Sequence, residues 1–179
     1  VRVGENDNPG YSLNLGTYVT AGSFAVLTYL GTTMLGYDMK IWYCNITGLV
    51  AGIVIGMTSD YYTSIERNPA KLTAESSQTG AAINILTGFS YGLISCFTAL
   101  LGIGIGSAVA YSISGVYGVG IAAVGMLSIA GIIIAGDAYG PIGDNSRGIA
   151  EMAKLGDRVL DLTDEIDAAG NTTKAITKG

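Results

Sequence analysis

Long apolar stretches separated by short polar segments run through most of the chain. They occupy residues 16–36, 41–62, 81–112 and 117–152, and the last of them continues into a more polar helical pattern. One helical crossing of a bilayer takes about 20 apolar residues, and no charged residue occurs between Ala81 and Gly136. The pattern predicts an all-α fold, a multi-pass transmembrane helical bundle of about four spans, in which residues 161–179 begin a fifth.

The composition favours lipid over water as the solvent. Hydrophobic residues make up 49% of the chain and charged residues 13%, and the mean hydropathy is +0.46. Among the 27 glycines, pairs such as Gly102 and Gly106 recur at the spacing that lets membrane helices approach closely. The net charge of −5 leaves no basic stripe for phosphates, which excludes a nucleic-acid partner. An integral membrane protein in contact with the lipid bilayer is expected.

The basic residues indicate which side of the membrane is cytoplasmic. Arg67 and Lys71 lie between the second and third predicted spans. Arg147 and Lys154 lie near the end of the fourth, and the opposite side carries only Lys40. An alternating path through the spans puts the basic segments on one side, and by the positive-inside rule that side is cytoplasmic.

Two carboxylates near the end of the fourth apolar stretch are the first candidates for chemistry. Asp137 and Asp144 are seven residues apart, so on a helix they project from one face about two turns apart. Pro141 between them is expected to kink or loosen that helix. Such carboxylates suit a hard divalent cation such as Mg²⁺, with a phosphate completing its coordination. The alternative is a solvated helix end with two ordinary acids.

A second group of polar residues forms a stripe on the last predicted helix. Asp167, Asn171, Lys174 and Lys178 follow one another at spacings of four, three and four residues, which places them on one face. Oxygens on this face suit a metal ion and the ammonium groups suit a phosphate, as in sites of phosphoryl transfer. The alternative is a helix with surface ion pairs that compensate one another.

Three segments resemble the signature of the membrane-bound, ion-translocating inorganic pyrophosphatases. They are residues 137–145 (Asp-Ala-Tyr-Gly-Pro-Ile-Gly-Asp-Asn), 148–152 (Gly-Ile-Ala-Glu-Met) and 167–173 (Asp-Ala-Ala-Gly-Asn-Thr-Thr). Residues 60–64 (Asp-Tyr-Tyr-Thr-Ser) resemble a further element of that family, although Asp60 stands where Glu is usual. The resemblance covers most of the chain and is strongest from Gly136 onward.

The resemblance implies an enzyme that is also a primary pump. Members of the family are homodimers that hydrolyse Mg²⁺-pyrophosphate on the cytoplasmic side and move H⁺ or Na⁺ across the membrane. The chain is then expected to be an internal fragment of a multi-pass protein of the plasma membrane or of an acidic organelle. Because other parts of the family's site lie on other spans, the fragment alone is expected to be inactive.

The resemblance also implies roles for single residues. Asp144 and Asn171 match positions that bind the substrate and its Mg²⁺. Asp137 and Lys178 match catalytic motif positions, and Lys178 is also expected to bind the substrate. Asp60 is expected to have a structural or coupling role.

Two further residues bear on the cation requirement. K⁺-independent members of the family carry Lys and Thr where this chain has Lys174 and Thr177, so the resemblance implies the K⁺-independent type. A tethered ammonium group can take the place of a bound K⁺ beside the negative charge of the substrate. Arg147 stands where a small residue is usual, and we expect it to pair with Asp144, three residues earlier.

The apolar helical pattern is also compatible with one other function. A secondary ion transporter would also be a glycine-rich bundle, with its coupling carboxylates near the middle of the membrane. In this chain Asp60, Asp137 and Asp144 instead gather near one predicted face. That distribution favours chemistry on the cytoplasmic side.

Overall fold

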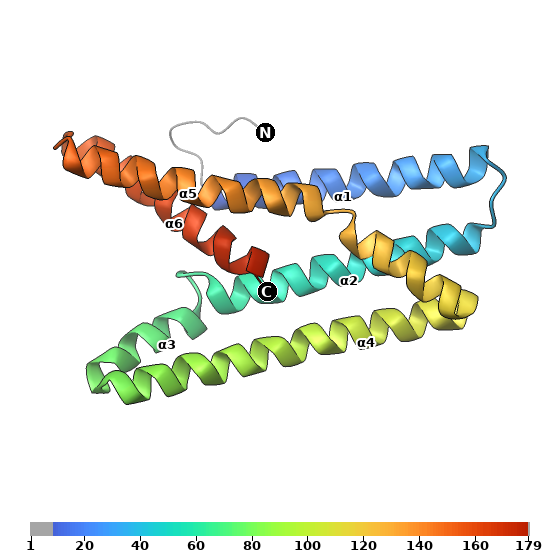
Figure 1. Ribbon diagram of the computed structural model, residues 1–179, viewed down its shortest axis with the longest axis horizontal. Helices are drawn as coiled ribbons and strands as arrows, with labels where there is room; N and C mark the ends of the chain where they lie inside the picture. Colours follow the sequence, from blue (N-terminus) through green and yellow to red (C-terminus); the bar gives the residue numbers. More distant parts are fainter. Residues whose placement is uncertain (1–8, 179) are drawn as a thin grey trace.

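The protein is built from helices along the whole part of the chain that is described. The computed structural model describes residues 9–178, without the side chains of residues 9, 10, 12, 13, 172 and 175–178. The α-helices are α1 (Pro9–Met34), α2 (Met39–Thr63), α3 (Asn68–Ser76), α4 (Ala81–Leu127), α5 (Ala130–Met152) and α6 (Asp157–Lys178), and a short 3₁₀ helix, η1 (Ser77–Thr79), follows α3. The prediction of an all-α fold is confirmed (Figure 1).

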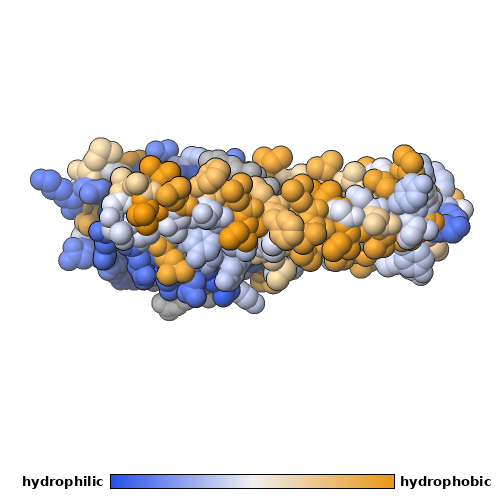
Figure 2. Space-filling view, turned by 90° about the horizontal axis from the view of Figure 1, so that it is seen from below, coloured by the Kyte–Doolittle hydropathy of each residue, from blue (hydrophilic) through white to orange (hydrophobic). Residues whose placement is uncertain are grey.

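The long helices run back and forth along the longest axis of the molecule (Figure 1). The α1–α2 turn lies at one end, and α3 lies at the other end together with the turn between α5 and α6. Figure 2 shows that hydrophilic residues gather over the α3 end, whereas hydrophobic residues cover most of the other half. The helices therefore alternate in direction, and Asp60 in the last turn of α2 lies at the opposite end of that helix from Lys40.

Local sequence explains where the second helix begins. Gly36 takes a positive φ of 70° after α1, a conformation that glycine adopts without strain. The Asp38 carboxylate then accepts a hydrogen bond from the Lys40 amide at 2.9 Å and caps the first turn of α2. The chain therefore reverses within four residues.

Helix α4 contains a sharp change of direction. Ser114 has φ −148° and ψ 28°, and Gly115 has φ 60° and ψ −150°, so the helical geometry is lost there. This bend lies between the predicted spans 81–112 and 117–152. The second of these stretches consists of two helical pieces, because Ser128 and Ile129 separate α4 from α5.

By length and composition, two helical stretches are apolar enough to cross a membrane, Met39–Thr79 and Ala81–Met152. How many times the chain crosses, and at which residues, stays a prediction. Pro141 lies inside α5, which is continuous from Ala130 to Met152.

The closest packing joins α2 to the second part of α4. A Cβ atom built on Gly48 would lie 2.8 Å from the Cα atom of Ala122, and one built on Gly125 would lie 2.7 Å from Oδ1 of Asn45. Real Cβ atoms do not approach so closely, so only glycine fits at both positions. Cys44 is fully buried beside this contact and acts as a small packing residue.

Candidate functional site

The sequence brings α5 and α6 together as an antiparallel pair. Lys154, in the turn after α5, has a positive φ of 53°, and the Leu155 amide donates to the Ala150 carbonyl at 3.1 Å. This pattern is a common way to end a helix. The chain reverses here, so the last turns of α5 lie beside the first turns of α6.

Glycines form the face of α5 that meets α6. A Cβ atom on Gly136 would lie 2.8 Å from Cγ2 of Thr173, and one on Gly143 would lie 3.2 Å from Cγ2 of Ile166. Between them, a Cβ atom on Gly140 would lie 2.9 Å from Cδ of Lys174. Gly136, Gly140 and Gly143 are buried. Because Gly140 has no side chain, a groove remains on α5, and the Lys174 side chain lies in this groove.

Lys174 ends in the centre of the candidate site. Its Nζ atom donates to Oδ2 of Asp144 at 2.8 Å and to Oδ1 of Asn171 at 3.3 Å. The Lys174 side chain is only 19% exposed, whereas that of Asp144 is 58% exposed. The ammonium group is thus held against α5 while the carboxylate that binds it remains open to a further ligand.

Asp167 adds a second carboxylate to this group. It lies within electrostatic range of Asp144, Asn171 and Lys174. In the described part of the chain its Oδ1 atom is buried and has no hydrogen-bond partner. The sequence places Asp167 on the polar stripe, but no individual role was predicted for it. Its spacing of four residues from Asn171 was the signal that the two side chains lie on the same face of the helix.

The expectation that Arg147 pairs with Asp144 is wrong. The Arg147 guanidinium group makes ion pairs with Asp164 and, at 2.9 Å, with Glu151. Asp164 lies on the facing turn of α6 and Glu151 lies one turn further along α5, so both reach Arg147 more directly. Asp144 pairs with Lys174 instead.

The remaining predicted residues lie at different places. Asp137 is exposed on α5, two turns before Asp144. Asp60 lies in the last turn of α2, where the charged groups that act on it are Arg67 and Glu66. Lys178 and Thr177 belong to α6, but their side chains lie outside the described residues, so their roles stay predictions.

The donor set is compatible with Mg²⁺ without forming a complete cage. Among the described residues, no group of three or more His, Cys, Asp or Glu side chains is placed to hold a metal ion. Asp144, Asp167 and Asn171 offer carboxylate and amide oxygens, and one Asp167 oxygen is buried without a partner. Mg²⁺ in phosphate-handling sites takes one or two carboxylates and completes its shell with substrate and water oxygens. The three side chains fit that requirement.

Together, these features define a class of protein. It is an all-helical protein with apolar, glycine-packed helices of membrane-spanning length and a cluster of acid, amide and amine side chains on α5 and α6. A sequence model described as inorganic H⁺ pyrophosphatase matches residues 1–179. The chain belongs to this family, and it is an integral membrane protein.

Curated relatives agree with this assignment. The chain is 43% identical over 168 residues to a K(+)-insensitive pyrophosphate-energized proton pump of Methanosarcina mazei, which covers 89% of this chain and 25% of the relative. It is 39% identical over 187 residues to a K(+)-stimulated pyrophosphate-energized sodium pump of Thermotoga maritima, covering 97% and 26%. A K(+)-insensitive proton pump of Pyrobaculum aerophilum is 38% identical over 194 residues, covering 96% and 27%.

The chain thus spans about a quarter of the length of these relatives. Relatives named for opposite K⁺ responses and for different ions match it almost equally well. Overall identity therefore does not decide the cation requirement or the pumped ion, and single residues such as Lys174 carry more weight.

Proposed function

We propose that the protein hydrolyses pyrophosphate to phosphate on the cytoplasmic side of a membrane and couples this reaction to translocation of H⁺ or Na⁺. The observation that carries the proposal is the cluster of Asp144, Asn171 and Lys174 in a chain of this family. Helices α5 and α6 bring these side chains together, with Nζ of Lys174 2.8 Å from Oδ2 of Asp144 and 3.3 Å from Oδ1 of Asn171. The 179 residues supply one part of the site. Pyrophosphate and the transported ion are the partners that this function requires.

The residues of the cluster have distinct tasks in the proposed site. Asp144 and Asn171 would hold Mg²⁺ through oxygen atoms, and the bound ion would offset the charge of the pyrophosphate oxygens. Asp167 places a further carboxylate beside them. Asp137 and Lys178 remain our candidates for contacts with the substrate, on the faces of α5 and α6 that continue from the cluster.

Lys174 supplies a fixed positive charge. Its side chain lies in the groove over Gly140, and Asp144 and Asn171 orient its ammonium group. A cation held in this way needs no recruitment from solution, which supports the K⁺-independent type of pump.

The wider arrangement is also part of the proposal. We infer a multi-pass protein that works as a homodimer in the plasma membrane or in an acidic-organelle membrane, with the α3 end of the bundle in the cytoplasm. The basic residues Arg67, Lys71 and Arg147 near that end support this orientation. Asp60, on the same end, is a candidate for coupling or structural support.

The proposed chemistry is tested with Asp144→Asn and Asn171→Ala in the complete protein. Each variant removes a charge or an oxygen ligand, so we expect the Mg²⁺ concentration needed for half-maximal pyrophosphate hydrolysis to rise by about tenfold or more. Asp161→Asn, a change to an exposed acid on α6, is the matched control. Wild-type kinetics at limiting Mg²⁺ in both site variants would overturn the assignment.

The orientation is tested by labelling. Cysteines introduced at Lys40 and at Lys71 should react with a membrane-impermeant reagent from opposite sides of sealed vesicles. Reaction of both from one side contradicts the alternating path.

A further inference from the structure

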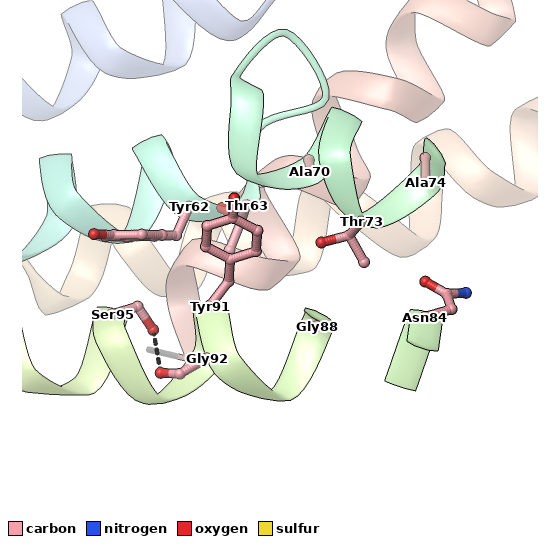
Figure 3. Close-up of a pocket in the computed structure, with 10 residues that line it drawn as sticks. All are labelled: Tyr62, Thr63, Ala70, Thr73, Ala74, Asn84, Gly88, Tyr91, Gly92 and Ser95. Atoms are coloured by element: carbon pink, nitrogen blue, oxygen red, sulfur yellow. Dashed lines mark hydrogen bonds between the residues drawn. The ribbon is translucent and has the colours of Figure 1, made fainter. Parts of the chain in front are cut away.

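A cleft of about 500 Å³ lies between the end of α2, helix α3 and the first half of α4 (Figure 3). Its described lining comes from these three helices, so it is separate from the cluster on α5 and α6. The volume is within the range of small-molecule sites, which is about 300–1,000 Å³. Among the described residues the lining contains no charged side chain, which disfavours a phosphate or carboxylate as its occupant.

Three aliphatic hydroxyl groups in the cleft act as acceptors. Thr63, Thr73 and Ser95 each donate the hydroxyl hydrogen to a main-chain carbonyl three or four residues earlier, at 2.7 to 2.8 Å. A hydroxyl group has one hydrogen and two lone pairs. With the hydrogen committed to the helix, each side chain offers only oxygen lone pairs to the cleft. These three side chains therefore favour a ligand that donates hydrogen bonds.

Two tyrosine rings provide the second feature. The rings of Tyr62 and Tyr91 lie 6.5 Å apart between centroids at an angle of 44°, and both residues line the cleft in Figure 3. Tyr61 packs edge-on against Tyr62 at 5.2 Å and holds it in place. The face of a tyrosine ring attracts cations, especially substituted ammonium groups.

Glycine leaves the space for an occupant. Gly88 and Gly92 line the cleft one turn apart on α4. A Cβ atom on Gly92 would have no neighbour within 4 Å, and one on Gly88 would meet Thr73 only at 3.6 Å. A larger residue at Gly92 is therefore tolerated by the fold while it fills the cleft, which makes this position a useful probe.

We propose that the cleft binds an organic ammonium group, that of a phospholipid ethanolamine headgroup or of a small free amine. An ammonium group supplies several hydrogen-bond donors to the hydroxyl oxygens and a positive charge to the ring faces. This site is additional to the proposed pyrophosphate chemistry and does not depend on it.

The test measures access to the cleft in the complete protein, reconstituted in phosphatidylglycerol vesicles. The reporter is Ala74→Cys, a lining residue that makes no proposed contact with the ligand, in a Cys96→Ala background, and the rate of its reaction with a small uncharged maleimide is recorded. We expect ethanolamine to slow this reaction by about fivefold or more, and ethylene glycol, which lacks the amine, to leave it unchanged. Vesicles that contain phosphatidylethanolamine should give the same protection without added amine if the lipid is the source.

Matched variants separate binding from indirect effects. Gly92→Leu should abolish the protection, and Gly104→Leu, an equal change at an open position on the same helix, should keep it. Exposed Cys96 in the parent protein, which is not among the described lining residues, should show no protection. If the reporter variant does not fold, Ala70→Cys gives a second reporter from α3. The proposal is overturned if neither ethanolamine nor phosphatidylethanolamine slows the reaction.

Discussion

Glycine lies at the closest approach in both of the main helix pairs, α2 with α4 and α5 with α6. In the first pair the space is taken by the backbone of the other helix, since a Cβ atom on Gly48 would lie 2.8 Å from Cα of Ala122. In the second pair the space over Gly140 is taken by the flexible side chain of Lys174. The same residue type thus serves rigid packing in one region and the placement of a charge in the other.

This difference matters because the neighbours respond differently to change. A backbone cannot retreat without moving its whole helix, whereas a lysine side chain can swing away at low cost. The α2–α4 pair should therefore tolerate no added atoms. At Gly140 of the α5–α6 pair, an added methyl group should be tolerated structurally, with a loss of function instead.

The largest effect is expected for Gly48→Ala. The added methyl group collides with the main chain of Ala122, so we expect a loss of more than about 3 kcal/mol of stability and little folded protein. Gly56→Ala on the same helix, where nothing lies within 4 Å, is the control and should be neutral or slightly stabilising. Thermal unfolding in detergent measures both. Equal melting temperatures for the two variants would show that the backbone contact is not tight.

Lys174→Ala should leave the fold intact and change the cation requirement. Removing the ammonium group from between Asp144 and Asn171 should lower pyrophosphate hydrolysis in K⁺-free, Na⁺-free buffer by about tenfold or more. Added K⁺ should restore much of the activity, because it can occupy the vacated position. The parent protein should show no stimulation, and strong activation of the parent by K⁺ contradicts the assignment.

A smaller version of that effect is expected for Gly140→Ala. The new methyl group overlaps the Lys174 side chain, which can shift, so the melting temperature should change little. The ammonium group moves away from Asp144, and we expect activity without K⁺ to fall by about two- to fivefold, with partial recovery in K⁺. Gly148→Ala on α5, with open space around it, is the control. A large loss of stability without K⁺ stimulation would mean that Gly140 packs like Gly48.

The sequence predicts the fold well where the signal is local. Apolar runs place the helices, and the gap between the stretches 81–112 and 117–152 places the bend in α4. Gly115 takes the positive φ of that bend. The break at Ser128 and Ile129 has no such signal, since it lies within an uninterrupted apolar run.

The candidate site, like the fold, could be predicted from the sequence only where the signal is local. The stripe from Asp167 to Lys174 follows from helical spacing, which the sequence contains. The pairing of Lys174 with Asp144 joins residues 30 positions apart and depends on the groove at Gly140, so it requires the packed helices. Arg147 was misassigned for this reason. Its nearest acid in sequence is Asp144, but the facing turn of α6 brings Asp164 closer to it.

The smallest effect is expected for Arg147→Gly, which introduces the small residue that is usual at this position in the family. Arg147 pairs with Glu151 and Asp164, whose side chains are 69% and 55% exposed, and ion pairs so open to water contribute little to stability. We therefore expect an almost unchanged melting temperature and an unchanged Mg²⁺ dependence of hydrolysis, because Asp144 keeps its contact with Lys174. Arg147→Lys, which retains the charge, is the matched variant and should behave alike. A different outcome would contradict this view: Arg147→Gly shifts the Mg²⁺ dependence as strongly as Asp144→Asn, and Arg147→Lys does not. The charge of Arg147 would then act on Asp144, and the two residues would not belong to independent ion pairs.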